Sequence, residues 1–339
     1  MQSKVRDSFA FLVMTYNHEG YILEHLESIK YLVLTHGSNI DVDLIINDDC
    51  SRDKTTALID QWLSLNTNIF RCVKNLYSQE NLGTCASIKN LLKHVVARRC
   101  KITAGDDVYS YENIFILTRN ESDLSITSGR VLYLRGDILS HDRFMDVFAT
   151  ATQVVYRGDS LMHRFKHISH NNAPNLFYGP GTLTSPEVLR DLEQYDVIED
   201  WPMQIGIAKH FPHIKFKLIN EVLVYYRRTL GSTYIVWNKR FVDDKNKIFN
   251  SLIRDETNLF EIIRLRNRQF CFNLQWRSLK KFLNFDIYIF AVNSLLKCGH
   301  ICIMQASVKV SLSKHKEHYH MIRKKAKHFV ARNKQLCDG

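Results

Sequence analysis

The residues of this chain best suited to chemistry are two pairs of adjacent aspartates, each directly after a short apolar stretch. Asp106 and Asp107 follow residues 102–105, and Asp48 and Asp49 follow residues 44–47. Neighbouring carboxylates repel each other and are costly to desolvate, and a metal ion or a hydrogen-bonded ligand relieves that cost. Two strands are followed by aspartates, in a chain whose predicted strands and helices alternate. This arrangement predicts a site at the carboxyl edge of one sheet.

The elements that would position these aspartates alternate between apolar strands and amphipathic helices. The expected strands cover residues 9–14, 42–47, 70–73 and 101–103, and the expected helices cover residues 22–33, 53–65 and 84–96. The unbroken apolar run at 9–14 is typical of a buried strand in a parallel sheet. This alternation implies right-handed crossovers and a doubly wound sheet.

The pattern changes after about residue 124. It predicts strands at 126–134, 153–156 and 215–226, a tight turn at 179–184 that leads into another strand, and a short helix at 186–192. From about residue 235 to the end the chain is expected to be helical. We therefore predict an α/β domain over residues 1–234 and a helical, basic region over residues 235–339.

The charge balance favours anionic partners, because the formal net charge is +11 over 339 residues. The basic segment 315–334 is interpreted either as a solvated helix face or as a membrane contact. No recognition motif accompanies the charge, so we expect no nucleic-acid partner. The eight cysteines show no paired spacing and no signal peptide precedes them, which favours a reduced, cytoplasmic protein.

An apolar segment at 282–304 raises the question of a membrane span. A span needs about 20 largely uncharged residues. The segment is interrupted by Asp286, Asn293, Lys297 and His300. We therefore predict an amphipathic helix, either packed on the core or lying at a membrane interface.

Six motifs follow one another in a characteristic order. They are Thr15-Tyr16-Asn17, Asp48-Asp49-Cys50-Ser51-Arg52-Asp53-Lys54-Thr55, Asn81-Leu82-Gly83 with Lys89-Asn90, Gly105-Asp106-Asp107, Glu199-Asp200, and Tyr225-Tyr226-Arg227-Arg228-Thr229-Leu230-Gly231-Ser232. Their order and spacing resemble the family 2 glycosyltransferases, which are nucleotide-sugar enzymes of the GT-A fold, over about residues 9–232. The resemblance implies a Rossmann-like, doubly wound mixed sheet with a C-terminal helical, basic extension. The chain departs from the family pattern at Ala104, where a further aspartate is usual, and at Lys89, where arginine is usual.

The resemblance also implies a donor site. Its expected residues are Thr15, Tyr16, Asn17, Asp48, Gly83, Lys89, Asp106, Arg227, Arg228 and Ser232. By analogy, Asp48 accepts a hydrogen bond from the uracil ring, whose N3–H is a donor that a carboxylate can read. Gly83 lets the backbone approach the ligand, and Lys89 reaches toward phosphate. Arg227 or Arg228 would hold phosphate oxygens in a closed loop.

The same resemblance assigns the metal and the base. Asp106, with Asp107 close behind, is expected to hold Mg²⁺ or Mn²⁺ between the two phosphates. Asp200 is expected to take the proton of the acceptor hydroxyl, with Glu199 as the alternative base or an orienting group. On another interpretation, both acids simply favour the positive N-terminus of a helix over residues 201–209.

These assignments predict an inverting, metal-dependent glycosyltransferase that moves a sugar from a UDP-linked donor to a hydroxyl of a glycan acceptor. The resemblance implies a lipid-linked acceptor, synthesis of a surface polysaccharide such as O-antigen or capsule, and a peripheral place on the inner face of the plasma membrane. One alternative is a non-catalytic nucleotide- or glycan-binding domain of the same fold. The other is a sugar nucleotidyltransferase, which needs a glycine-rich, basic loop after the first strand that residues 15–20 do not offer.

Overall fold

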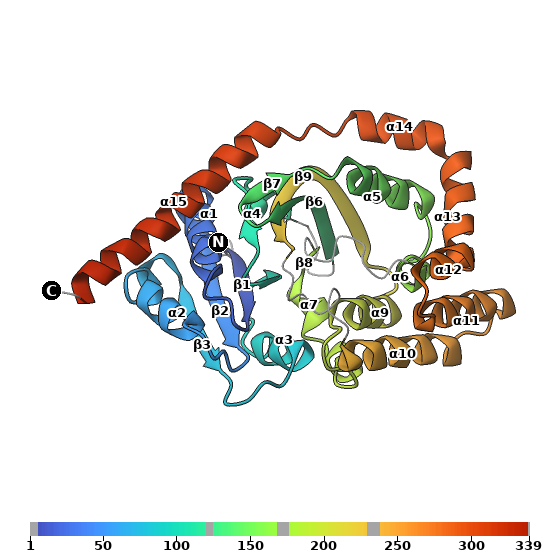
Figure 1. Cartoon of the computed structure of the whole chain (residues 1–339), viewed down its shortest axis with the longest axis horizontal. Coiled ribbons are helices and arrows are strands. Elements are labelled where there is room, and N and C mark those ends of the chain that lie inside the picture. Colours follow the sequence, from blue (N-terminus) through green and yellow to red (C-terminus); the bar gives the residue numbers. More distant parts are fainter. Residues whose placement is uncertain (1–5, 120–124, 168–175, 229–237, 338–339) are drawn as a thin grey trace, which may run out of the picture.

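One large mixed sheet forms the centre of the molecule, and helices cover both of its faces (Figure 1). The computed structural model describes residues 6–119, 125–167, 176–228 and 238–337. Its strand order is β3-β2-β1-β4-β8-β6-β9-β5, with β7 paired to β6. The predicted α/β class, with a doubly wound sheet and a C-terminal helical extension, is confirmed.

The first half of the chain supplies the parallel part of the sheet. Its strands are β1 (Asp7–Thr15), β2 (Ile40–Asp48), β3 (Cys72–Tyr77) and β4 (Arg99–Ala104). They are connected by α1 (Ile22–His36), α2 (Thr55–Ser64), the short 3₁₀ helix η1 (Thr67–Ile69) and α3 (Thr84–Leu92). Thr15 pairs with Asp48, and Met14 pairs with Ala104. The strands that carry the motifs therefore end at one level, at the same edge of the sheet.

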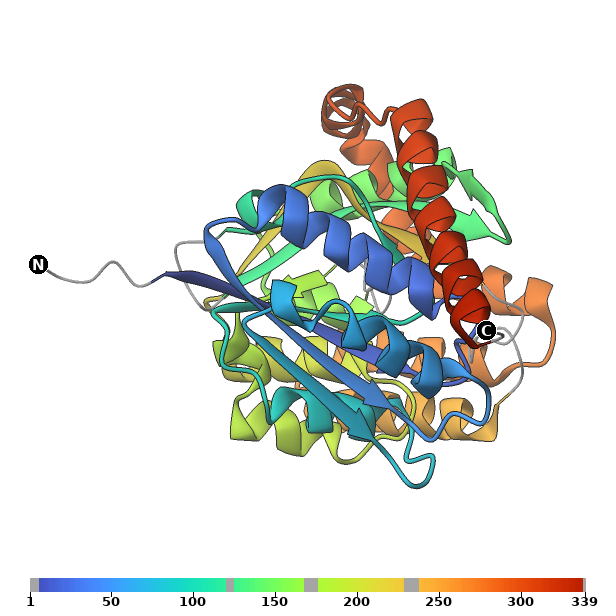
Figure 2. The same cartoon turned by 90° about the vertical axis from the view of Figure 1, so that its left-hand side faces the viewer.

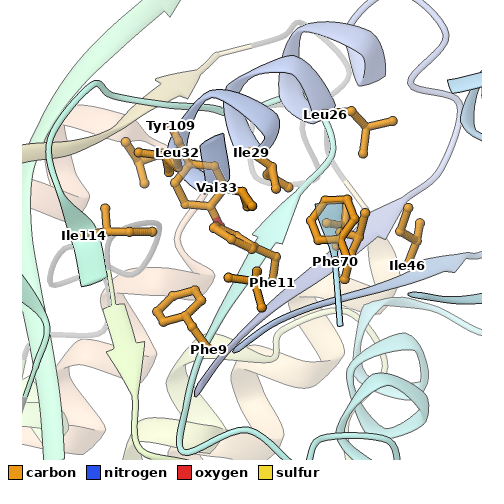
Figure 3. Close-up of a cluster of buried hydrophobic side chains, with 14 of the residues drawn as sticks. Phe9, Phe11, Leu26, Ile29, Leu32, Val33, Ile46, Phe70, Tyr109 and Ile114 are labelled. Atoms are coloured by element: carbon orange, nitrogen blue, oxygen red, sulfur yellow. The ribbon is translucent and has the colours of Figure 1, made fainter. Parts of the chain in front are cut away.

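Alternation along β1 explains why both faces of the sheet are covered. Phe9 and Phe11 point toward α1, where they join a buried cluster with Leu26, Ile29 and Val33 (Figure 3). Ala10 and Leu12 point to the opposite face and pack with α3 and with helices of the second half. A strand with apolar residues at successive positions buries both of its faces, as an internal parallel strand must.

The second half of the chain extends the sheet with mixed pairing. Its strands are β5 (Val108–Tyr109), β6 (Ser125–Arg135), β7 (Ile138–Ser140), β8 (Leu176–Tyr178) and β9 (Lys215–Arg227). Its helices are α4 (Ile114–Leu117), α5 (Arg143–Val155), α6 (Leu161–His167), α7 (Pro180–Leu183), α8 (Pro186–Leu192) and α9 (Asp200–His210). β5 runs antiparallel to the end of β9, which brings the Arg227 region next to the Asp106–Asp107 pair.

The C-terminal helices run around the edge of this domain and return beside α1 (Figures 1 and 2). They are α10 (Lys239–Arg254), α11 (Leu259–Asn273), α12 (Arg277–Phe282), α13 (Phe285–Leu296), α14 (Cys298–Ala306) and α15 (Leu312–Cys337). α10 packs Phe249 against Trp201 of α9, and α15 buries Tyr319 and Ile322 against strands of the second half. The predicted domain boundary at 234/235 lies outside the described residues.

Two local predictions were wrong. Residues 153–155 end helix α5 instead of forming a strand. The Asp142 side chain caps this helix by accepting a hydrogen bond from Met145 N, and Val154 and Val155 belong to its buried side. Residues 180–183 form the short helix α7 instead of a turn into a strand.

The apolar segment at 282–304 forms two helices instead of one. α13 and α14 meet at Lys297 with a bend of 75°. Within the described ranges, no single helix is long and apolar enough to cross a membrane, and this bent pair meets the length and composition criteria only when its two helices are taken together.

Candidate functional site

Backbone hydrogen bonds join the motif residues at the carboxyl edge of the sheet. Asp49 N donates to Thr15 O (2.9 Å), and Gly105 N donates to Met14 O (2.8 Å). These bonds continue the ladders one residue beyond the strands. The turns that carry Asp48, Asp106 and Thr15 are therefore fixed relative to one another.

Asp48 is buried and its oxygens are already bonded to the protein. Its Oδ1 accepts a hydrogen bond from Ser51 N (2.7 Å). Its Oδ2 accepts hydrogen bonds from Thr15 Oγ1 (2.7 Å) and Ser51 Oγ (2.6 Å). The structure thus gives Asp48 a role in shaping the turn after β2, and the recognition of uracil by Asp48 stays a prediction.

Asp49 has a structural role that the sequence did not reveal. Its two oxygens accept hydrogen bonds from Leu82 N and Gly83 N, both at 2.8 Å. Gly83 has a φ of 91°, and a Cβ there would lie 2.6 Å from Asp196 O and from an Arg240 side-chain nitrogen. The glycine therefore permits a close approach between two protein segments, and its N–H is used within the protein instead of pointing to a ligand.

The other predicted donor residues of the first half differ in their availability. Lys89 forms a 2.5 Å ion pair with Glu193, and its contact with phosphate stays a prediction. Asn17 has a φ of 54°, and its side chain accepts a hydrogen bond from Arg52 N (2.9 Å). Tyr16 is 43% exposed at the sheet edge, and its contact with the donor stays a prediction.

The aspartate pair after β4 divides into an inner and an outer carboxylate. Asp107 is buried, its Oδ1 accepts a hydrogen bond from Arg227 N (2.9 Å), and its backbone oxygen accepts one from His25 Nδ1 (2.8 Å). Burial, and then the charge of Asp106, raise the pKa of Asp107. Asp106 is partly exposed, and no hydrogen bond to its carboxylate occurs among the described residues. Asp106 is therefore the carboxylate free to bind a cation.

Gly105 makes this division sterically possible. A Cβ at residue 105 would lie 2.7 Å from Thr15 Cγ2 and 3.0 Å from Ile22 Cδ1. Any larger residue would push the end of β4 away from β1 and α1. The glycine holds Asp106 close to the Thr15 turn.

The residues present fit a small divalent cation. Mg²⁺ and Mn²⁺ prefer oxygen ligands and are commonly bound by one or two carboxylates together with substrate phosphates. Asp106, which has no carboxylate hydrogen bond among the described residues, and the buried Asp107 beside it provide these carboxylates. Asp106 is the ligand that this arrangement offers directly, with Asp107 behind it.

A second group of possible ligands lies on α6 and α11. The ligand atoms of His163, His167 and Glu261 lie within 4.8 Å of one another. Both His167 nitrogens already bond to carboxylates, at 2.7 Å to Glu261 and 3.1 Å to Asp286. Arg264 pairs with the same two carboxylates. The group is therefore a network of ion pairs that joins α6 to the C-terminal helices.

Arg227 is bonded to other protein groups in this structure, and its contact with phosphate stays a prediction. Its side chain is buried, and its nitrogens donate to Glu24 Oε2 (2.6 Å), Asp106 O (2.7 Å) and Gly136 O (3.0 Å). Tyr319 of α15 donates to the same Glu24 oxygen (3.0 Å). Arg227 thus connects the metal motif to α15, and sequence reasoning missed this role because the partners are far apart in the chain.

The remaining predicted residues of the closing loop are only partly described. The Arg228 guanidinium lies 4.1 Å from the centre of the Tyr133 ring. Ser232 lies outside the described residues. The prediction of a loop that covers the diphosphate therefore stays a prediction.

The second acidic pair sits where α9 begins. Glu199 is the N-cap residue, and Asp200 Oδ1 accepts a hydrogen bond from Trp201 N (2.7 Å). The preceding loop is held by Asp244 of α10, whose Oδ2 accepts hydrogen bonds from the N–H groups of residues 196, 197 and 198 at 2.8, 2.7 and 3.1 Å. Asp244 has no sequence signal of its own, and it fixes the position of the pair.

Both acids of this pair are half-buried. Desolvation, and then the charge of Asp200, raise the pKa of Glu199 to about 8. Glu199 therefore holds its proton more tightly than an ordinary glutamate does. Lys101, buried in β4, interacts electrostatically with both Glu199 and Asp107, so the two acidic pairs share one neighbour.

Comparisons with solved structures identify the fold. The structure of S. aureus TarS has 15% identity and a TM-score of 0.53, and the match covers 80% of this chain and 44% of that one. S. aureus TarS 1-349 in complex with UDP-GlcNAc has 13% identity and a TM-score of 0.54, with 95% and 92% covered. The mannosyltransferase PcManGT from Pyrobaculum calidifontis, in complex with GDP-Man and Mn²⁺, has 12% identity and a TM-score of 0.52, with 94% and 86% covered. At these identities the likeness shows the fold, which is that of the GT-A glycosyltransferases.

The family follows from the sequence model. Residues 10–117 match the model of glycosyl transferase family 2. The predicted resemblance to this family is therefore confirmed over residues 10–117, and the predicted fold is confirmed. No curated protein matches the chain significantly. The chain spans less than half the length of the first TarS structure.

Proposed function

We propose that this chain is an inverting, metal-dependent glycosyltransferase that uses a nucleotide-sugar donor, most simply a UDP-sugar. The observation that carries this proposal is the placement of two acidic pairs, Asp106 with Asp107 at the carboxyl edge of the sheet and Glu199 with Asp200 at the start of α9, where desolvation raises the pKa of Glu199 to about 8. The solved relatives in complex with UDP-GlcNAc and with GDP-Man support a nucleotide-sugar donor.

The residues of the chain suggest the following division of work. Asp106, backed by Asp107, would hold Mg²⁺ or Mn²⁺, which when bound supplies positive charge for the departing nucleoside diphosphate. Asp200 takes the proton from the acceptor hydroxyl as its oxygen attacks the anomeric carbon. The bond from that carbon to the diphosphate breaks on the opposite face, so the configuration inverts. Tyr16 offers its exposed ring to the base or ribose.

We further propose that the acceptor is a lipid-linked saccharide at the inner face of the plasma membrane. The net charge of +11 supports an anionic surface as partner. A cytoplasmic location supports access to nucleotide sugars. The polysaccharide to which the sugar is added is expected to be a surface glycan such as O-antigen or capsule.

A transfer assay with a matched variant pair tests the metal and donor assignments. The wild-type chain with Mn²⁺ is incubated with UDP-GlcNAc, other UDP-sugars or GDP-Man, and release of the nucleoside diphosphate is measured. Asp106→Asn should reduce turnover by about 10²-fold or more, because it removes a cation ligand. Asp243→Asn changes an exposed aspartate on α10 and should leave turnover unchanged.

Two results would overturn the proposal. Full activity of Asp106→Asn in the presence of EDTA would exclude the metal role. Thermal stabilisation by UDP-sugars without any turnover would favour the alternative of a non-catalytic binding domain, which Ala104 in the metal motif also favours.

A further inference from the structure

The C-terminal helices expose an apolar surface that the chain itself does not cover. Helix α13 has no buried residue in the structure. Large apolar side chains of α12, α13 and the segment before them are exposed to solvent; the principal ones are Trp276, Phe282, Phe285, Val292, Leu295 and Leu296. Leu295 and Leu296 are 72% and 79% exposed. We call this surface the α12–α13 face.

Helix α13 turns its apolar side toward solvent and its polar side toward the protein. Phe285, Val292 and Leu295 repeat at spacings of seven and three, so they share the outer side. The charged and polar positions face the protein instead, since Asp286 pairs with Arg264 (2.8 Å) and Lys297 donates to Val155 O (2.8 Å). A helix on a water-exposed surface normally shows the opposite arrangement.

The α12–α13 face is continuous across the break between its helices. Tyr288 Oη donates to Phe282 O (2.7 Å), which ties the end of α12 to the first turns of α13. The inner side of α13 is anchored through Phe290, whose ring centre lies 5.0 Å from that of Phe148 in α5. These contacts hold α12 and α13 in place, so the apolar side chains of the α12–α13 face stay exposed and do not pack into the core.

The exposed charges on the stretch that carries this face have one sign. Residues 259–310 contain two acids, Glu261 and Asp286, and both are engaged in ion pairs with Arg264. The basic residues of the same stretch are Arg264, Arg266, Arg268, Arg277, Lys280, Lys281, Lys297 and Lys309. Of these, Arg266, Lys281 and Lys309 are exposed. Exposed apolar side chains on a stretch whose exposed charges are cationic match the surface of an anionic bilayer, whereas a second copy of the chain would bring like charges together.

We propose that the α12–α13 face docks on an anionic lipid bilayer, with α13 lying in the interfacial plane. This inference rests on the proposed function, because it gives the enzyme a surface with which to reach a lipid-linked acceptor. The 75° bend between α13 and α14 favours an interfacial position over a span. The basic helix α15 does not supply this surface, since its apolar residues Tyr319, Ile322 and Ala326 are buried against the sheet domain.

Flotation of the full chain with lipid vesicles tests the proposal. The protein should float with vesicles of equal parts phosphatidylcholine and phosphatidylglycerol, and much less with vesicles of phosphatidylcholine alone. The double variant Leu295→Asn and Leu296→Asn should reduce the bound fraction at least tenfold on the anionic vesicles. The control Leu34→Asn and Val96→Asn changes residues that are similarly exposed elsewhere, at 62% and 78%, and should bind normally.

The outcomes separate this proposal from its alternatives. Equal flotation of the two double variants would overturn it. Concentration-dependent dimers that the Leu295/Leu296 variant abolishes, without vesicle binding by the wild-type chain, would assign the face to self-association. Asp106→Asn should float like the wild-type chain, and the Leu295/Leu296 variant should still hydrolyse a soluble donor. A failure of membrane docking is thereby distinguishable from a failure of the proposed chemistry.

Discussion

The two acidic pairs of the site resemble each other in sequence and differ in how the fold supports them. In each pair desolvation raises the pKa of one carboxyl group, that of Asp107 in the first pair and that of Glu199 in the second. The pair after β4 is supported by side chains, through Arg227, Glu24 and Tyr319 of α15. The pair at α9 is supported by backbone hydrogen bonds to one side chain, Asp244 of α10.

This difference shows what the C-terminal helices contribute. The match to the family model ends at residue 117. Each support includes a residue beyond it, Tyr319 of α15 for the metal pair and Asp244 of α10 for the base pair. The C-terminal helices thus help to position the site. Substitutions in α10 should disturb the base pair first, and substitutions in α15 should disturb the metal pair first.

The largest effect is expected at the base pair. Asp244→Ala leaves the N–H groups of residues 196–198 without their acceptor, and each buried unsatisfied group costs about 1–3 kcal/mol. The free energy of unfolding in urea should therefore fall by roughly 4 kcal/mol. Asp243→Ala changes the exposed neighbour and should leave this free energy unchanged. Equal effects of the two substitutions would contradict the assigned support.

A smaller effect is expected at the metal pair. Glu24→Gln leaves the buried Arg227 guanidinium without its ion-pair partner, and breaking such a pair costs about 3 kcal/mol. Tyr319→Phe removes one hydrogen bond to Glu24 and should cost about 1 kcal/mol. Both variants should weaken Mn²⁺-dependent donor binding, measured by calorimetry, while acceptor KM stays constant. A change in acceptor KM alone would show that the network does not serve the metal pair.

A modest effect per residue is expected from pH. Burial lowers the pKa of His315 and His318 on α15 to about 4, from an ordinary value of 6.5. Both are neutral in the folded chain, so their contribution is complete above pH 6.5 and is lost as the pH falls from 6.5 toward 4. At about pH 5.5 the loss is roughly 1 kcal/mol per histidine. Hydrogen exchange corrected for intrinsic rates should then show α15 losing protection while α10 keeps it, and equal losses would contradict the comparison.

The sequence was informative where local pattern decides the structure. β1 and β2 contain apolar runs that end in motif residues, and the metal motif directly follows β4, so the parallel half of the sheet and its edge could be predicted. Residues 153–155 were mispredicted because a short apolar run cannot distinguish a strand from the buried side of a helix.

The supports of the site could not be predicted in the same way. Glu24 and Tyr319 are separated by 295 positions, and no local pattern connects them. Asp48 and Arg227 are bonded within the protein because long-range packing brings their partners close. Lys101 did carry a signal, since a lysine inside a buried strand next to two acids must find a charged neighbour.

The division of labour between Glu199 and Asp200 is the central claim, and kinetics of two isosteric variants test it most directly. kcat is measured at saturating donor and acceptor for Asp200→Asn and Glu199→Gln at neutral pH. Asp200→Asn should lower kcat by about 10²–10⁴-fold, since it removes the proton acceptor. Glu199→Gln preserves a neutral polar group and should retain most of the kcat. The reverse order, with Glu199→Gln inactive and Asp200→Asn active, would contradict the account.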